Sequence, residues 1–324
     1  MKAWRGLLAM TALLAASNAL ADQFAEARVW LERMSASMRE QSYQGTFVYV
    51  RGDDVETIRL THVLENGAIR ERLVALSGPP REVVRDGRGL RAVGERGDAT
   101  SPPAQLVGVP IPDFSAASLE RAQARYMFEM GGEGRIAGYQ GRKLTITPRD
   151  QYRYGYELWL EDRTALLLRW VLYDPDRRPL AKLMFTELVT GDAVDHTALG
   201  EEADQPAATG GTPQAAPVRA AASPEAFPVD ELTLPPGFAL AAQGRDPANP
   251  ESEHLVFSDG LASVSVYLEP SAAETGLPEG LSRVGTTNAW SRRGEDRRVT
   301  VVGEVPPVTL KTIGRAFLRL DVAE

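Results

Sequence analysis

The sequence contains no cysteine, and histidine occurs only three times among its 324 residues. The absence of cysteine excludes disulfide bonds, thiol nucleophiles and cysteine-ligated metal sites. None of the histidines, His62, His196 and His254, stands in a metal-ligand spacing such as HExxH. The sequence also has no GxSxG nucleophile motif and no EF-hand loop. We therefore expect no catalytic site, metal or cofactor, and a hydrolase with an unfamiliar site is kept only as an alternative.

Long apolar runs are scarce. The clearest one covers residues 6–16, directly after a short basic start. It is shorter than the roughly 20 apolar residues that a helix needs to cross a bilayer. Ala19 and Ala21 supply the small residues that a signal peptidase recognises. We predict a signal peptide over residues 1–21, cleaved after Ala21, and the alternative is an uncleaved anchor.

The negative charges outnumber the positive ones, with a net charge of -8. Nucleic acid and anionic lipid surfaces repel such a chain as a whole, so we expect no nucleic-acid partner. One local basic cluster is an exception, and it consists of Arg292, Arg293, Arg297 and Arg298. Arginine binds phosphate or carboxylate through paired hydrogen bonds, which favours contact with lipid phosphates or an acidic partner segment. The alternative is a solvated turn whose charge is partly neutralised by Glu295 and Asp296.

The composition changes over residues 200–224, which are rich in alanine, proline, glycine and threonine and contain no aromatic residue. Such a segment cannot bury enough apolar surface to offset the entropy lost on ordering. We predict a flexible linker there. It separates an N-terminal domain over residues 22–199 from a C-terminal domain over residues 225–324.

The N-terminal domain begins with a helical pattern over residues 23–41, where Trp30, Leu31, Met34 and Met38 recur at helical spacing. The period then changes to two, which is typical of strands. The predicted strands cover residues 44–50, 56–63, 69–76, 81–85, 124–130, 134–139, 142–147, 155–160, 166–173 and 179–188. Strands at this spacing without intervening helices indicate a curled antiparallel sheet. We expect a loop over the proline-rich residues 101–112 and a flexible hairpin at the glycines of residues 131–134.

The C-terminal domain is smaller. Its predicted strands cover residues 253–258, 261–269 and 298–304, and Asp259-Gly260 is a hairpin signal between the first two. Leu310, Ile313, Phe317 and Leu320 fall on one face of a final helix. This pattern indicates a small α+β unit.

Apolar and aromatic strand residues of the first domain could line a pocket inside a curled sheet. The candidates are Phe47, Tyr49, Ile58, Leu60, Tyr154, Tyr156, Leu158, Trp159 and Trp170. Ordinary core packing is the alternative for each of them. Tyrosine is the better indicator, because a buried hydroxyl needs a partner or water. The alternation of Tyr152, Tyr154 and Tyr156 therefore favours a wet or ligand-facing wall.

Several segments resemble one known family in order along both domains. They read SYQGTFVYVRG (Ser42–Gly52), RIAG (Arg135–Gly138), PRDQYRYGYELWL (Pro148–Leu160), TALLLRW (Thr164–Trp170), LPPGF (Leu234–Phe238), HLVFSDGLASVSVYLEP (His254–Pro270) and VVGEVPPVTLKTIG (Val301–Gly314). The chain resembles the periplasmic sigma-E regulatory proteins of the RseB/MucB family over most of its mature length. Two departures are the long linker and the bulky Trp290.

The resemblance implies a mainly β, α+β fold. The first domain would be an incomplete antiparallel β-barrel around a helix, with a hydrophobic pocket as in lipoprotein carriers, and the second a smaller partner-binding domain. It further implies a non-enzymatic negative regulator that binds the periplasmic region of a single-span anti-sigma factor and shields it from proteolysis. Lipid, lipopolysaccharide or mislocalised lipoprotein would release it. A lipoprotein or acyl-chain carrier without a regulatory partner is the alternative function, and formation of a homo-oligomer is left open.

Overall fold

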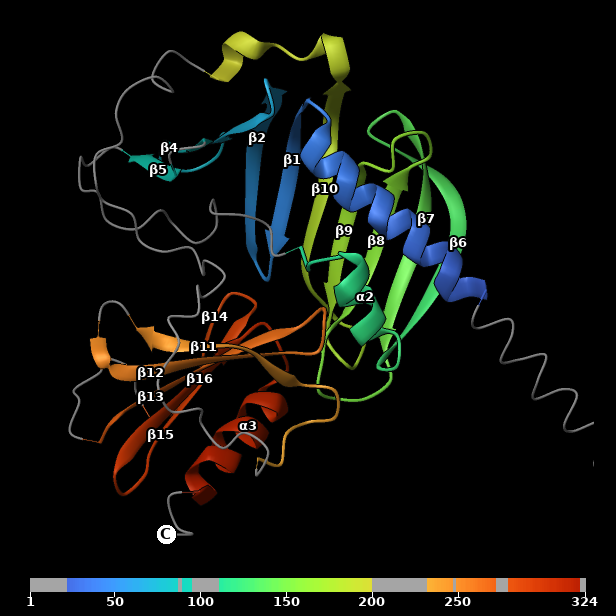
Figure 1. Ribbon diagram of the computed structural model, residues 1–324. Helices are drawn as coiled ribbons and strands as arrows, with labels where there is room; N and C mark the ends of the chain where they lie inside the picture. The colour runs from blue at the N-terminus through green and yellow to red at the C-terminus, as the bar shows by residue number, and fades with distance from the viewer. Residues whose placement is uncertain are drawn as a thin grey trace, which may run out of the picture.

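The computed structural model describes residues 22–86, 89–94, 111–199, 232–246, 249–271 and 279–320. The predicted signal peptide over residues 1–21, the predicted linker over residues 200–224 and most of the predicted loop over residues 101–112 lie outside these ranges. Within the described ranges the chain forms two antiparallel sheets, each with its own hydrophobic core (Figure 1). None of the helices in these ranges has the length and apolar character needed to cross a membrane.

The first sheet contains ten strands and is not closed. The strands are β1 (Tyr43–Arg51), β2 (Asp54–Glu65), β3 (Ala68–Ala75), β4 (Arg81–Asp86), β5 (Gly89–Gly94), β6 (Tyr126–Ile136), β7 (Tyr139–Pro148), β8 (Gly155–Glu161), β9 (Leu167–Tyr173) and β10 (Pro179–Thr190). Their order is β5-β4-β3-β2-β1-β10-β9-β8-β7-β6, so β5 and β6 are the two edges. Two consecutive meanders are thus joined through the antiparallel pair β1–β10. The predicted incomplete antiparallel barrel is confirmed.

Local sequence explains the hairpins of this sheet. Along β1, burial alternates strictly at first, which places Tyr43, Phe47 and Tyr49 on the inner face. The β2–β3 turn is formed by Asn66 and Gly67, both with positive φ (52° and 78°). A two-residue hairpin turn requires this conformation, and asparagine and glycine adopt it readily. The predicted strands over residues 155–160 and 166–173 are also confirmed, as the antiparallel pair β8–β9.

The predicted N-terminal helix is confirmed over residues 22–40 and runs across the inner face of the sheet (Figure 1). It buries Ala27, Leu31 and Met34, while the guanidinium groups of Arg33 and Arg142 lie 4.7 and 5.4 Å from the Trp30 ring centroid. The Arg142 contact attaches the helix to β7, whereas Arg33 belongs to the same helix as Trp30.

Three short helices complete the first domain. Helix α2 (Ala116–Ala122), which the sequence did not predict, begins at Ser115, whose hydroxyl accepts a hydrogen bond from the Ser118 amide. Two short 3-10 helices, η1 (Gly191–Ala193) and η2 (His196–Leu199), follow β10.

The prediction of a hairpin at residues 131–134 was wrong. Strand β6 continues through these glycines with a register shift between Met130 and Glu133, and the turn comes later, at Ala137 and Gly138. The glycines are explained by their neighbours. A Cβ at residue 134 would lie 2.7 Å from the Trp159 ring, and one at residue 131 would lie 2.6 Å from Lys143 Cε. Glycine here makes room for side chains of β7 and β8 rather than forming a turn.

The second sheet contains six strands in the order β11-β12-β13-β16-β15-β14. They are β11 (Ala239–Asp246), β12 (Asn249–Ser258), β13 (Ser263–Pro270), β14 (Gly280–Val284), β15 (Thr287–Arg293) and β16 (Arg297–Gly303), followed by helix α3 (Pro307–Leu320). The predicted α+β unit is confirmed, although β11, β14 and β15 were not predicted. Leu310, Ile313 and Phe317 are buried against the sheet as expected, and the Leu320 side chain lies outside the described part. The bulky Trp290 packs directly on Gly314 of α3.

Candidate functional site

The inner face of the first sheet contains a cavity of about 200 Å³. Its lining comes from the end of the N-terminal helix, from strands on both sides of the β1–β10 seam and from the segment before α2: Met38, Tyr43, Phe47, Leu60, Glu71, Leu73, Arg85, Ile111, Leu167, Leu183 and Phe185. Most of these side chains are apolar. The cavity is smaller than the roughly 300–1,000 Å³ of usual ligand pockets, so it suits part of an apolar chain.

One end of the cavity is polar. Glu71 Oε2 lies 3.0 Å from an Arg85 guanidinium nitrogen, and Glu71 Oε1 lies 2.9 Å from Nδ1 of His62. The His62 ring is buried and stacks on Tyr43 at a centroid distance of 4.7 Å. Burial alone would raise the pKa of Glu71, but the hydrogen bond with His62 and the charge of Arg85 outweigh burial and lower that pKa. The cavity therefore combines apolar walls with one neutralised ion pair.

The structure separates the predicted pocket residues. Phe47 and Leu60 line the cavity. Ile58, Leu158 and Trp170 are buried in the core of the first domain, and Trp159 lies on the opposite face of β8, against Gly134. The remaining candidates, Tyr49, Tyr154 and Tyr156, lie where the first domain meets the second.

The tyrosine-rich segment contacts the second domain. Tyr156 belongs to β8, whereas Tyr152 and Tyr154 lie in the connection that precedes it. The Tyr154 hydroxyl accepts a hydrogen bond from Asn288 Nδ2 at 3.0 Å. Thr309 Oγ1 donates to the Tyr152 carbonyl oxygen at 2.6 Å. These two tyrosines thus position the end of the first sheet against β15 and α3.

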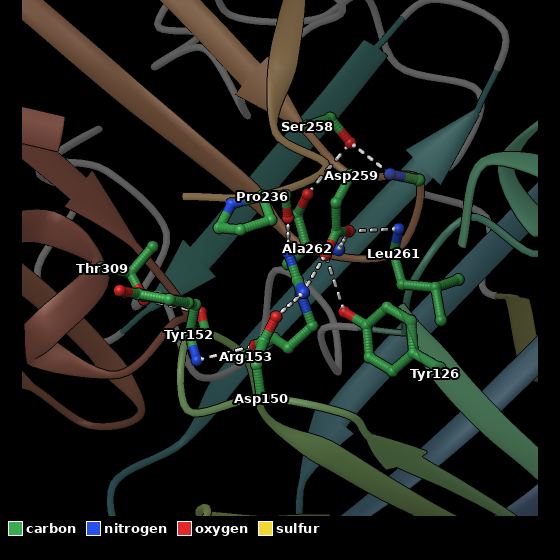
Figure 2. A network of polar contacts seen from close by, with 11 residues as sticks. Tyr126, Asp150, Tyr152, Arg153, Pro236, Ser258, Asp259, Leu261, Ala262 and Thr309 are labelled. Atoms are coloured by element: carbon green, nitrogen blue, oxygen red, sulfur yellow. Dashed lines mark hydrogen bonds and ion pairs between the residues drawn. The ribbon is translucent and has the colours of Figure 1, made fainter. Parts of the chain in front are cut away.

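A buried arginine joins the two domains (Figure 2). The Arg153 side chain is fully buried, and its Nε donates to Asp259 Oδ2 at 2.7 Å. One terminal nitrogen donates to Asp150 Oδ2 at 2.5 Å, and the other donates to the Pro236 carbonyl oxygen at 2.7 Å. A buried guanidinium is tolerated only when its charge and its N–H groups are satisfied. Two of the three acceptors, Asp259 and Pro236, belong to the second domain.

The buried carboxylate of Asp259 also has hydrogen-bond partners for both of its oxygens. Its Oδ2 also accepts from the Tyr126 hydroxyl at 3.0 Å, and its Oδ1 accepts from the backbone amides of Leu261 and Ala262 at 2.9 and 2.8 Å. These bonds fix the turn between β12 and β13, as Figure 2 shows. We call the bonds among Tyr126, Arg153 and Asp259 the interdomain network.

The same turn inserts into the first domain. Leu261 is buried within the hydrophobic core of the first domain. Gly260 has a φ of +109°, and a Cβ there would lie 2.3 Å from the Ser118 carbonyl oxygen of α2. Only glycine permits both this conformation and this close approach.

The arginine cluster is not part of this interface. Arg292 and Arg293 are exposed at the end of β15, Arg297 is half-buried, and Arg298 is buried at the start of β16. The opposite end of β15 carries Asn288, which contacts Tyr154. The structure therefore places the cluster at the end of the second sheet that points away from the first domain.

Sequence reasoning missed Arg153 and Asp259 as site residues. They are 106 positions apart, and no local pattern pairs them. Two features of the sequence could have indicated them: Arg153 stands inside a tyrosine-rich segment, and Asp259 stands in a predicted turn. No group of three or more His, Asp or Glu side chains arranged to hold a metal occurs among the residues that the structure describes.

An open antiparallel half-barrel with an apolar cavity, docked through a buried polar network to a smaller α+β domain, defines a two-domain protein built for binding. The model of the MucB/RseB N-terminal domain matches residues 26–203, and that of the MucB/RseB C-terminal domain matches residues 223–317. The chain belongs to the MucB/RseB family.

Individual relatives agree with this assignment. The sigma factor AlgU regulatory protein MucB of Pseudomonas aeruginosa is 36% identical over 302 residues, covering 90% of this chain and 91% of that protein. The sigma-E factor regulatory protein RseB of Escherichia coli is 25% identical over 297 residues, covering 87% of each chain. Among solved structures, P. aeruginosa MucB in its complex with MucA is similar, with a TM-score of 0.63 and 34% identity over 89% of this chain and 97% of that one. MucB in complex with the periplasmic part of MucA gives a TM-score of 0.62 at 32% identity.

Proposed function

We propose that this protein is a periplasmic negative regulator of an envelope-stress sigma factor. It binds the periplasmic region of a single-span anti-sigma factor and shields that region from proteolysis. The observation that carries the proposal is the match to both family domains, in order, by a chain whose relative MucB is a sigma factor regulatory protein solved in complex with MucA. Removal of residues 1–21 as a signal peptide would deliver the protein to the periplasm.

In this proposal the second domain, residues 225–324, together with the adjoining side of the first domain, holds the anti-sigma factor. The exposed guanidinium groups of Arg292 and Arg293 are candidates for contact with acidic groups of that partner or with lipid phosphates. The residues of the linker, 200–224, would connect the two domains.

The cavity of the first domain is the proposed site of the releasing signal. Its apolar walls suit an acyl chain of lipopolysaccharide or of a mislocalised lipoprotein, and its volume of about 200 Å³ suits one segment of such a chain. A lipid can release the partner only if it binds more tightly to the partner-free arrangement than to the bound one. Occupancy of the cavity and occupancy of the partner site must therefore oppose each other.

The test measures both ligands on the same protein. Residues 22–324 are titrated with the periplasmic segment of the anti-sigma factor from the same source, with and without lipopolysaccharide, by isothermal calorimetry. We expect binding that weakens as lipid is added. Failure to bind the segment would overturn the regulatory function.

A pair of leucine variants separates lipid sensing from partner binding. Leu73→Trp fills the cavity, whereas Leu76→Trp places the same bulk on a neighbouring exposed leucine. We expect Leu73→Trp to keep partner affinity and lose the lipid effect, and Leu76→Trp to keep both. If the filled variant responds to lipid like the wild type, the cavity is not the lipid site.

The cavity also favours a second function, that of a lipoprotein or acyl-chain carrier without a regulatory partner. A carrier needs only the half-barrel, so the docked second domain counts against it. Recovery of acylated lipoproteins alone from solubilised envelope, with no anti-sigma factor, would favour the carrier.

A further inference from the structure

The domain interface contains a half-buried glutamate that forms no ion pair with any residue that the structure describes. Glu304 lies between the end of β16 and the start of α3. Its Oε1 atom is buried and accepts no hydrogen bond from the described residues. The side chain of Thr286, in the β14–β15 turn, supplies a hydrogen bond to the carboxyl. Asp259, which lies at the same interface, is by contrast held by Arg153, Tyr126 and backbone amides.

The segments on both sides of Glu304 contact the first domain: Asn288 Nδ2 donates to the Tyr154 hydroxyl and to the Val305 carbonyl oxygen, and a Cβ at Gly285, beside Thr286, would lie 2.6 Å from the Arg51 guanidinium. Burial, followed by the negative charge of Glu304, raises the pKa of Tyr49 to about 12 and raises the pKa of Tyr156 well above its ordinary value. Burial also raises the pKa of Tyr154, and Glu304 contributes in the same direction. Glu304 is therefore close enough to β1, to β8 and to the β7–β8 connection to act on all three hydroxyl groups.

The charged groups around these tyrosines do not neutralise Glu304. Arg51 lowers and Glu56 raises the pKa of Tyr49, while Arg283 lowers and Asp174 raises the pKa of Tyr154. The negative charge of Asp259 raises the pKa of Tyr156.

Both neighbouring arginines have other contacts. Arg51 lies 3.9 Å from Asp54, and Arg283 Nε donates to the Gly285 carbonyl oxygen at 2.7 Å. Neither forms an ion pair with Glu304 among the described contacts.

We infer that the interface between the two domains is a proton-sensitive latch, closed when Glu304 is neutral and loosened when Glu304 is ionised. A carboxylate buried without a cation is unfavourable, whereas separation of the domains would return it to water. The latch concerns the protein alone and operates whether or not an anti-sigma factor or a lipid is bound.

The direction of the effect follows from the proton balance. Burial, only partly opposed by the Thr286 hydrogen bond, raises the pKa of Glu304 to about 7 in the docked arrangement. In the separated arrangement the carboxyl regains its ordinary value of 4.5. The docked arrangement thus holds the proton more tightly. Its extra stability is complete below the ordinary pKa and is lost as the pH rises through about 7.

With these two pKa values, the ratio of separated to docked molecules should rise about tenfold between pH 6 and pH 8 and then level off.

Single-molecule energy transfer measures this ratio directly. The chain has no cysteine, so Arg59→Cys in the first domain and Arg315→Cys on α3, both exposed positions, carry the only two dyes. Glu304→Gln should abolish the pH dependence and stay docked at pH 8. Glu304→Asp keeps a carboxyl group and should keep the dependence. Glu295→Gln removes an exposed carboxylate of the same domain and should behave like the parent.

A measurement on the unsubstituted chain gives an independent check. A carbon-13 titration of labelled glutamate should show one carboxyl that titrates near neutral pH. The latch is overturned if the ratio does not change between pH 6 and pH 8, if Glu304→Gln retains the wild-type pH dependence, or if every glutamate titrates below about pH 5.5.

Discussion

Breaking the interdomain network from one side should separate the domains. In Arg153→Met, the side chain keeps its length but loses its charge, and Asp259 remains buried with only neutral donors. Removal of one partner of a buried ion pair typically costs about 3–5 kcal/mol. Arg153 contacts two groups of the second domain, Asp259 and the Pro236 carbonyl, so we expect the upper part of this range.

The opposite change should be milder. Asp259→Asn keeps the oxygen that accepts from the backbone amides, but its new N–H₂ group faces the Arg153 Nε–H, and two donors cannot bond to each other. Arg153 still has Asp150, so we expect a loss of about 2–3 kcal/mol.

A double-mutant cycle tests whether the two residues act on each other. In Arg153→Met combined with Asp259→Asn the facing donor is gone, so the double variant should be about 2 kcal/mol more stable than the sum of the single changes. The assay is the loss of energy transfer between the dyes at residues 59 and 315 as urea is added. Additivity within about 0.5 kcal/mol would refute the reasoning, because it would mean that the network does not couple the domains.

Three further substitutions test other contacts. Gly260→Ala should separate the domains in the same assay and cost at least about 2 kcal/mol more than Gly138→Ala, because both positions have positive φ but only the first lies against backbone of the other domain. Glu71 has a lowered pKa, so its contribution to stability is present above its ordinary pKa of 4.5 and is lost as the pH falls through the lowered value. Urea unfolding should therefore show less acid sensitivity in Glu71→Gln than in the wild type, and equal sensitivity would contradict this. Gly314→Ala should destabilise the second domain, despite a gain of about 1 kcal/mol in helix propensity, because the new Cβ would lie 2.1 Å from Trp290. Addition of Trp290→Leu should recover part of that loss in urea unfolding, and no recovery would show that this contact is not the cause.

Local pattern was sufficient for most of the fold. The alternation along β1, the Asn66-Gly67 turn and the helical spacing around Leu31 each specify a conformation within a few residues, and the structure has all three. The glycines of β6 do not form a turn, because they make room for side chains of other strands, as Gly134 does for the Trp159 ring. A local pattern cannot report such a contact.

The site was harder to predict than the fold. The alternation of Tyr154 and Tyr156 favoured a wet or ligand-facing wall, whereas the Tyr154 hydroxyl accepts a hydrogen bond from Asn288 of the second domain. Their position depends on how the second domain docks, and that docking rests on Arg153 and Asp259, which are far apart in sequence. The cavity likewise requires walls from both meanders, which meet only at the β1–β10 seam.

That seam has a consequence for the order in which the chain can fold. Tyr43 pairs with Thr190, so one of the two strands beside β1 is β10, the last strand of the first sheet. As the chain is synthesised, the β1–β5 meander must wait with the β1 edge unpaired until β10 has emerged. An unpaired edge is a template for association with other chains, and closure over so long a separation is slow. The first domain is therefore most vulnerable to aggregation before it is complete, and a chain truncated just before residue 179 should be insoluble even though nine of the ten strands of its sheet are already present in sequence.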